Sequence, residues 1–345
     1  MGGSRRKAGV FVGGSVNYLA KWYRLFFVLA YRICPVNKRF GGSVNIARRL
    51  AKPVYKRQRF LLSFLKGLNE PLAVTDFQEL LFLYLTRNNL PYYEFVPYLD
   101  GSYSIQAGED INTLEAMGWL AKTNGKISFA PDEKSVDTSS QFKKPWDLFS
   151  DELPKVRGND LTKLIYKQFP YFAINSQAAN SIIDAESKAQ VNSVKEQFKN
   201  TRQTLFTIGY EGITVERYLN ILITNNIYVL CDVRNNPISR KFGFSKSNLQ
   251  KYLGNIGIEY VHIPELGIKS EKRNNLNSDE DYKNLFFEYE ASLPGRLEYL
   301  VYLHRLLESR GRIALTCFEH DPSHCHRHVI RDFLTSNYNV EATDL

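Results

Sequence analysis

The chain has 345 residues, of which 43% are hydrophobic, so it is long enough for two or three domains with ordinary buried cores and is not a disordered protein. The net charge of +9 originates in residues 1–69, which contain fifteen Lys or Arg and no Asp or Glu, so that residues 70–345 sum to −6. A disulfide framework is excluded because the cysteines are too few and too unevenly spaced, and we therefore expect a cytoplasmic protein; the cysteines are Cys34, Cys231, Cys317 and Cys325.

Residues 1–56 form a basic arm. Its most apolar stretch, "YLAKWYRLFFVLAYRICPV", contains Lys21, Arg24 and Arg32, whereas a membrane-spanning helix needs about 20 nearly uncharged residues. The stretch also lacks the position and the small-residue cleavage site of a secretory signal. The arm could contact nucleic acid or anionic lipid, or serve as an organellar transit peptide. We expect instead an extension without structure of its own, or one that results from an over-long start assignment.

Residues 57–131 are expected to form a mainly helical, winged-helix-like domain. Apolar residues recur at helical spacing in 57–68, and "TDFQELLFLYL" continues as a second helix. A third helix in "EDINTLEAMGWL" closes at Gly118, after which the chain is expected to form a hairpin turned at Asn124-Gly125. Helices followed by such a hairpin are typical of winged-helix modules.

Residues 132–203 are expected to be a linker followed by a helical connector. The linker includes most of the polar run "PDEKSVDTSSQFKKP". From "DLTKLIYKQF" onward the chain is largely helical, with Pro170 interrupting the first helix.

Residues 204–345 alternate predicted strands and helices. Short apolar runs separated by helices indicate parallel pairing, so the predicted fold class is α/β, with a three-layer parallel-sheet C-terminal domain after the helical one. Right-handed crossovers bring the carboxyl ends of the strands to one edge. The predicted strands are 205–210, 227–233, 259–263 and 312–319, and the predicted helices are 214–224, 246–254, 282–308 and 325–336.

Polar and reactive side chains follow these strands directly. Because ligands of open α/β sheets bind outside the carboxyl ends of the strands, we expect a functional crevice there. Asp232, Glu265 and Glu319 are candidate general acids or bases, since carboxylates in different environments can divide those roles. The candidate substrate-binding residues are Tyr210, Glu211, Arg234, Ser239, His262, Cys317, Cys325, His326 and Arg327.

The stretch "TCFEHDPSHCHRHVI" is compatible with three kinds of site. An anion docked on the start of the last helix, held by the Arg327 fork, would explain positive charge where it opposes the helix dipole. A zinc site could use Cys317, Cys325 and one histidine, but seven residues separate the cysteines and no C-x-x-C pair occurs, so we expect no metal. A nucleophilic thiol remains open at Cys325, whereas Cys231 and Cys317 are expected in the sheet core.

The loop "NNPISRKFGFSK" interleaves basic residues with Phe242 and Phe244. This pattern suits a polyanion that also offers flat surfaces for stacking, such as single-stranded nucleic acid. The alternative is a surface loop with one phenylalanine tucked under it.

Five motifs occur in order between residues 204 and 336: "TIGYEG", "DVRNNPIS", "FSK", "YVHIPELG" and "CFEHDPSHCHR". Through them this part resembles the "domain of unknown function 488" family. Through "TDFQELLFLY", "PYYEFVPYLDGSYS" and "FPYFAINS", residues 57–183 resemble the N-terminal extension of longer members, which is similar to small helical domains of antitoxin-type proteins. The resemblance implies a function associated with DNA repair.

Two functions are expected. The first is an enzyme that processes nucleic acid or a nucleotide in DNA repair or phage defence, by hydrolysis in the crevice and without a cofactor. The alternative is a non-catalytic nucleotide-sensing regulator, or an antitoxin-like protein that binds a partner protein through residues 57–131. Protein contact is preferred there over DNA reading because the second helix carries Asp76, Glu79 and only Arg87.

Overall fold

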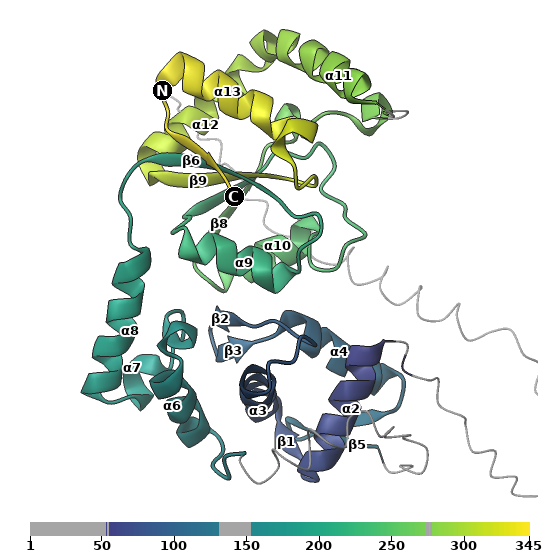
Figure 1. Cartoon of the computed structure of the whole chain (residues 1–345), viewed down its shortest axis with the longest axis vertical. Coiled ribbons are helices and arrows are strands. Elements are labelled where there is room, and N and C mark those ends of the chain that lie inside the picture. The colour runs from purple at the N-terminus through teal and green to yellow at the C-terminus, as the bar shows by residue number, and fades with distance from the viewer. Residues whose placement is uncertain (1–52, 54, 131–152, 274–275, 277) are drawn as a thin grey trace, which may run out of the picture. The chain divides into compact units, whose positions relative to one another are not determined.

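The computed structural model of the protein describes residues 53, 55–130, 153–273, 276 and 278–345 (Figure 1). Nearly all of the expected basic arm and most of the expected polar linker lie outside these residues. The described residues belong to one compact unit. Within the described part of the chain, no helix combines the length and the apolar character needed to cross a membrane.

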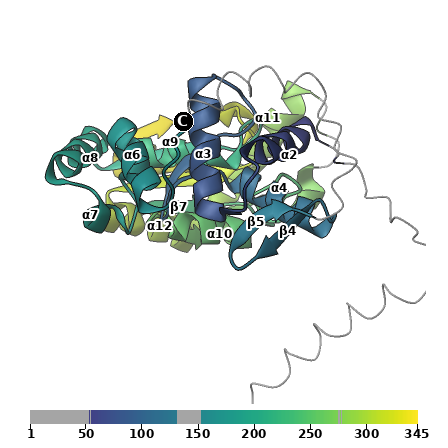
Figure 2. The ribbon, with the colours of Figure 1, turned by 90° about the horizontal axis from the view of Figure 1, so that it is seen from below.

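The first domain consists of three helices, a short hairpin and a three-stranded antiparallel sheet of order β1-β5-β4. Asn124 and Gly125 turn the β4–β5 hairpin with φ angles of 51° and 74°, as their sequence predicts. Figure 2 shows β4 and β5 side by side. The β2–β3 hairpin was not predicted. The elements are α2 (Lys56–Leu68), β1 (Leu72–Ala73), α3 (Val74–Arg87), β2 (Val96–Tyr98), β3 (Gly101–Tyr103), α4 (Ile105–Ala116), β4 (Leu120–Thr123) and β5 (Lys126–Phe129).

Helix α3 is the buried centre of the first domain. Every residue from Asp76 to Leu85 is buried, including the acidic side chains Asp76 and Glu79. The helix therefore presents little surface to a DNA groove or to a partner protein, and any partner of this domain must use another face.

The helical connector packs into the same core. It consists of α6 (Asn159–Gln168), η3 (Pro170–Ala173), α7 (Ala179–Ile182) and α8 (Ala185–Phe198), with the break at Pro170 that the sequence predicts. Leu161 and Ile165 of α6 share one apolar core with Leu80 and Phe82 of α3. The connector is thus part of the first domain's core, whereas the sequence predicted a segment that only links the two domains.

The C-terminal domain contains a five-stranded parallel sheet of order β10-β6-β9-β7-β8 (Figure 1). The four predicted strands are confirmed, and the edge strand β10 was not predicted. The predicted helix over 282–308 is divided by a 3-10 turn that contains Pro294 and Gly295. The elements are β6 (Thr204–Gly209), α9 (Val215–Thr224), β7 (Val229–Asp232), α10 (Lys246–Gly254), β8 (Glu259–His262), η4 (Pro264–Leu266), η5 (Ser270–Arg273), α11 (Asp279–Ala291), η6 (Leu293–Arg296), α12 (Leu297–Arg310), β9 (Arg312–Cys317), η7 (Pro322–His324), α13 (Arg327–Tyr338) and β10 (Ala342–Asp344).

Helices cover both faces of this sheet, which confirms the three-layer α/β prediction. Helices α9 and α10 share one core with Phe206, Ile208 and Leu230, and α11, α12 and α13 share another with Leu205 and Leu315. The central strands β6, β7 and β9 are buried at every position, and their middle residues are mostly apolar. Functional side chains are therefore concentrated at the strand ends.

A buried carboxylate joins the two domains. Glu216 of α9 accepts hydrogen bonds from the main-chain nitrogen of Gln106 at 2.7 Å and from Ser104 Oγ at 3.3 Å, at the start of α4. Val96 and Tyr98 of β2 also belong to the apolar core that contains α9. The first domain thus contacts the C-terminal domain on the side covered by α9 and α10, through buried hydrogen bonds and apolar side chains.

Candidate active site

The carboxyl ends of the parallel strands bring most of the expected residues to one edge. Strand β7 ends at Asp232, β8 ends at His262 and β9 ends at Cys317, while Tyr210 directly follows β6. Register places Asp232 beside both His262 and Thr316. The convergence expected from the strand order is present.

Asp232 and Arg234 form a buried ion pair at the centre of this edge. Arg234 Nε and Nη2 donate to the two carboxylate oxygens at 2.8 and 2.5 Å, and Tyr260 donates its hydroxyl to Asp232 Oδ2 at 2.7 Å. The Asp232 side chain is 0% exposed. With both oxygens engaged and no access to solvent, Asp232 positions Arg234, and this placement does not support its expected role as a general acid or base.

The rings of Tyr210 and Phe244 at this edge are part of the core. Phe244 is fully buried and its ring stacks on Tyr210 with centroids 4.3 Å apart. Arg234 Nη1 donates to the Tyr210 hydroxyl at 2.7 Å and to the Phe244 carbonyl at 2.9 Å. Phe244 is thus the phenylalanine tucked under the loop, and it does not offer a stacking surface to nucleic acid.

Other expected residues fix the loops. His262 Nε2 donates to the carbonyl oxygen of Arg234 at 3.0 Å. Ser239 Oγ accepts from the main-chain nitrogen of Lys241 at 3.1 Å, and Glu211 Oε2 accepts from that of His320 at 3.1 Å. Glu265 is exposed in η4, and its placement gives it no role among the buried contacts of this edge.

Arg327 is a structural tie and not the exposed fork that the sequence suggested. Its buried guanidinium donates through Nε to Thr207 Oγ1 at 3.2 Å and through Nη1 and Nη2 to the carbonyl oxygens of Glu319 and His320 at 2.5 and 2.8 Å. The 319–320 loop passes so close to β6 that a Cβ on Gly209 would lie 1.8 Å from the Glu319 oxygen. These contacts do not support the anion site expected on Arg327.

Beside this tie, Cys317, Cys325 and His326 form a buried cluster with Arg273 and Glu319. The ligand atoms of the two cysteines and the histidine all lie within 4.8 Å of one another. The end of β9 and the start of α13 meet here, so the seven residues between the cysteines form a loop that brings the thiols together. The spacing argument against a metal site therefore fails for this chain.

The two thiols of the cluster differ in acidity. The hydrogen bond from Cys325, together with the nearby His326 and Arg273, lowers the pKa of the Cys317 thiol. Burial, and then the contact with Cys317, raises the pKa of Cys325. The more acidic thiol is thus Cys317, which the sequence assigned to the core, and not Cys325. Burial, and then the nearby Cys317, also raises the pKa of Glu319.

Comparison with known proteins gives one match. The family model "Domain of unknown function DUF488" matches residues 214–334, the part of the chain that carries this edge. This part of the chain is a DUF488 domain. Neither a curated protein nor a solved structure matches the chain. The family description states no activity, so the site of the DUF488 domain must be interpreted from its own geometry.

A cavity of about 320 Å³ opens beside Cys317 at the same edge of the DUF488 domain. None of the described residues that line it is an Asp or Glu. The exposed Phe318 adds an apolar ring to the wall. We call this cavity the basic pocket, because its charged lining residues are Arg234, Arg240, Lys241 and Arg273.

The four cations of the basic pocket are held differently. Arg234 is fixed by Asp232, and Lys241 Nζ donates to the Tyr210 carbonyl oxygen at 2.5 Å. Burial lowers the pKa of Lys241, and the nearby Glu211 opposes this. Arg240 is exposed at the pocket. Arg273 was not predicted as a site residue, because it reaches Cys317 from a loop 44 positions earlier and no local pattern signals that contact.

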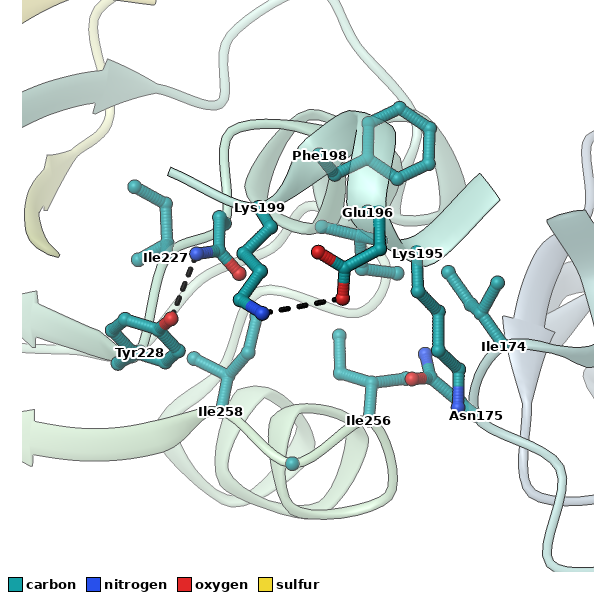
Figure 3. A pocket seen from close by; sticks show the side chains of 13 residues that line it. Ile174, Asn175, Lys195, Glu196, Phe198, Lys199, Ile227, Tyr228, Ile256 and Ile258 are labelled. Atoms are coloured by element: carbon teal, nitrogen blue, oxygen red, sulfur yellow. Dashed lines mark hydrogen bonds and ion pairs between the residues drawn. The ribbon is translucent and has the colours of Figure 1, made fainter. Parts of the chain in front are cut away.

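A second cavity, of about 370 Å³, lies at the opposite ends of the strands (Figure 3). It is lined by residues just before β7 and β8, such as Tyr228 and Ile258, and by helix α8. Four of its polar residues pair with each other: Lys199 donates to Glu196 at 3.2 Å, and Asn226 donates to the Tyr228 hydroxyl at 2.8 Å. The basic pocket is therefore the better candidate for chemistry.

Proposed function

We propose that the DUF488 domain binds a phosphate-bearing substrate, a nucleotide or a nucleic acid, in the basic pocket and hydrolyses it there. The observation that carries this proposal is the lining of the pocket, with four cationic side chains and no carboxylate among its described residues. A cleft lined by one sign of charge concentrates ligands of the opposite sign. Guanidinium groups match the geometry of phosphate, and the exposed ring of Phe318 offers a surface on which a nucleobase could stack.

Glu319 is the carboxylate that we assign to proton transfer. Asp232 is saturated by Arg234 and Tyr260, and Glu265 is exposed outside the buried cluster. Glu319 follows directly after the pocket residue Phe318, and its carboxylate pairs with Arg273 at 2.8 Å. Glu319 does not itself line the pocket, but both of these neighbours do. We therefore assign it to taking a proton from water or giving one to a leaving group, as hydrolysis of a phosphate or glycosidic bond requires.

The second candidate function is a nucleotide-sensing regulator. It is favoured by the contact of Glu216 with the start of α4, because this contact links the DUF488 domain to the first domain through buried groups. The β1-β5-β4 order with its β4–β5 hairpin supports the interpretation of the first domain as winged-helix-like. In this case a ligand in the basic pocket would change how the first domain binds a partner protein.

A binding and turnover experiment on the full chain tests both functions. The probes are inorganic phosphate, a panel of mononucleotides, and short single-stranded DNA and RNA. Binding is followed by thermal shift, where a ligand at 100 times its dissociation constant adds about 2.7 kcal/mol. Products are followed by chromatography. We expect Arg240→Ala and Lys241→Ala to weaken binding about tenfold or more, since a charge-assisted contact is worth about 1.5–3 kcal/mol.

Lys251→Ala is the matched control. Lys251 is an exposed lysine of α10 outside the basic pocket, so the variant loses the same charge and should bind like the wild type. Product formation that Glu319→Gln abolishes without loss of binding supports the enzyme, and binding without product supports the regulator. If no probe binds, or if Lys251→Ala weakens binding as much as the pocket variants, the basic pocket is not the ligand site.

A further inference from the structure

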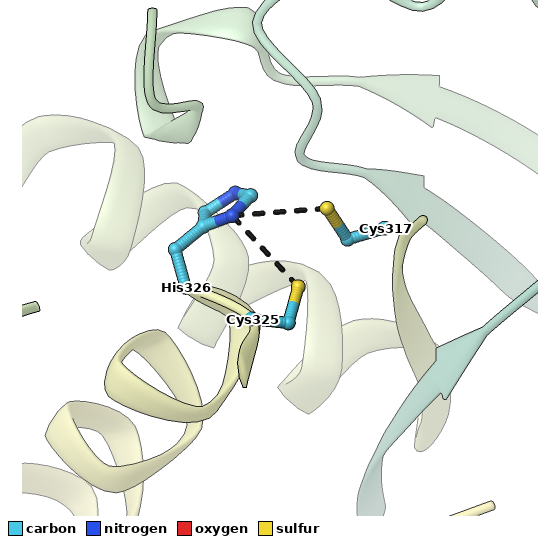
Figure 4. A group of neighbouring side chains, drawn as sticks. All are labelled: Cys317, Cys325 and His326. Carbon is cyan, nitrogen blue, oxygen red and sulfur yellow. Dashed lines mark hydrogen bonds between the residues drawn. The ribbon is translucent and has the colours of Figure 1, made fainter. Parts of the chain in front are cut away.

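The cluster of Cys317, Cys325 and His326 has the composition and the geometry of a metal site. All three side chains are buried, at 1%, 0% and 0% exposure. Figure 4 shows both sulfur atoms facing the same ring nitrogen of His326. Two thiols and an imidazole are the ligands that zinc prefers in proteins.

The hydrogen bonds of His326 leave a lone pair on that nitrogen, which accepts from Arg273 in this structure and could bind a metal ion in its place. Nε2 lies 3.0 Å from the carbonyl oxygen of Val233, which can only accept, so Nε2 carries the hydrogen. In the neutral ring Nδ1 then holds a lone pair, and it lies 3.7 Å from Cys317 Sγ and 3.9 Å from Cys325 Sγ. Histidines that bind metals almost always donate their other N–H group to such a partner.

The distances fit a tetrahedral ion. Zinc–sulfur bonds of about 2.3 Å and zinc–nitrogen bonds of about 2.0–2.1 Å at tetrahedral angles place nitrogen and sulfur roughly 3.5 Å apart. The two observed distances exceed this value by a few tenths of an ångström. We infer that Cys317, Cys325 and Nδ1 of His326 bind one zinc-like divalent ion.

Arg273 contacts two of the three ligand atoms. Its Nη2 atom lies 2.9 Å from His326 Nδ1 and 3.9 Å from Cys317 Sγ, so a guanidinium charge faces these two ligands. A metal ion would replace that charge, and Arg273 would then turn toward the basic pocket that it lines. A water molecule would complete the site, and Glu319, with Oε2 3.3 Å from Cys317 Sγ, lies beside it. An ion held there would act as a Lewis acid next to the pocket.

Metal titration of the full chain tests this site without any substrate, so its outcome is independent of the proposed function. The apo protein, prepared with a chelator, is titrated with Zn²⁺ and with Co²⁺. We expect one equivalent of tightly bound ion, and for Co²⁺ the strong visible bands of a tetrahedral site with a thiolate charge-transfer band. Cys317→Ser and Cys325→Ser should each weaken binding by more than about 100-fold, since even changes next to metal ligands cost ~10–100-fold.

Two further variants keep the test decisive. Cys231→Ser is the matched control, because Cys231 is an equally buried thiol of the same sheet outside the cluster, and it should retain one equivalent. Arg273→Ala should bind zinc at least as tightly as the wild type, since the ion no longer competes with a guanidinium. The inference is overturned if wild type and Arg273→Ala give no tetrahedral cobalt spectrum, or if the Cys325→Ser protein still binds one equivalent with unchanged affinity.

Discussion

Asp232 and Arg234 are two positions apart in the sequence and form a bidentate ion pair inside the DUF488 domain, with oxygen–nitrogen distances of 2.8 and 2.5 Å. The side chains are 0% and 6% exposed. The pair fixes a guanidinium at the wall of the basic pocket. The sequence pattern suggested Asp232 as a general acid or base, but both of its carboxylate oxygens accept hydrogen bonds from Arg234.

Asp232→Asn should therefore destabilise the protein before it affects any reaction step. Removing one partner of a buried ion pair leaves an uncompensated charge and costs about 3–5 kcal/mol of unfolding free energy. Denaturant unfolding measures the loss. Glu259→Gln, which breaks the exposed pair with Arg310, is the control and should cost less than about 1 kcal/mol. Unchanged stability of Asp232→Asn would contradict this structural role and would again allow Asp232 to act as a general acid or base.

Arg327→Lys should lower stability and leave anion binding unchanged. A lysine cannot reach Thr207 and the carbonyl oxygens of Glu319 and His320 together, and each hydrogen bond from a charged group contributes about 1.5–3 kcal/mol. A loss on the order of 2 kcal/mol is expected by denaturant unfolding, and none for the exposed Arg305→Lys on α12. If Arg327→Lys unfolds like the wild type but binds phosphate more weakly, Arg327 is a ligand-binding residue and not a structural tie.

Glu79 should make stability depend on pH. Burial raises its pKa from 4.5 to about 8, opposed by the hydrogen bond from Thr162, and Oε2 has no hydrogen-bond partner among the residues that the structure describes. The folded state therefore holds this proton more tightly than the unfolded state. The contribution of this bound proton to the free energy of unfolding is fully present below about pH 4.5 and is lost as the pH rises through about 8. Denaturant unfolding of the wild type at intervals of pH measures the decline.

Glu79→Gln isolates this contribution, because the amide keeps the shape of the acid and does not ionise. The difference in unfolding free energy between variant and wild type should shift in favour of the variant by more than about 1.4 kcal/mol between pH 5 and 8, the equivalent of one pKa unit. The exposed Glu109→Gln serves as control and should show no such shift. A constant difference across this range would mean that Glu79 is ionised in the folded protein.

Glu216→Ala should weaken the attachment of the first domain. The substitution leaves the main-chain N–H of Gln106 and the hydroxyl of Ser104 without their acceptor, at a cost of about 1–3 kcal/mol. Hydrogen exchange at the start of α4 should become faster, while exchange in β9 stays slow. Equal acceleration in both places would indicate global destabilisation and not a local contact.

The sequence alone predicted the layers of the C-terminal domain and four of its five strands, but not the edge strand β10 or the division of the helix over 282–308. Apolar runs such as "RIALTC" and "YVLCD" are long enough to define buried strands, and helices between them require parallel pairing. The β4–β5 hairpin was equally local, since Asn124-Gly125 specifies its turn. Because parallel strands end at the same edge, this order by itself also predicts that Asp232, His262 and Cys317 lie together.

The roles of those residues were decided by tertiary structure, because a role depends on partners that are distant in sequence. Besides two nearby carbonyl oxygens, the Arg327 guanidinium is held by Thr207, which lies 120 positions away, and Cys317 contacts Arg273 across 44 positions. The metal cluster likewise requires Val233 to orient His326 from 93 positions away. Local spacing cannot encode such contacts, since they arise only when separate strands and helices have packed.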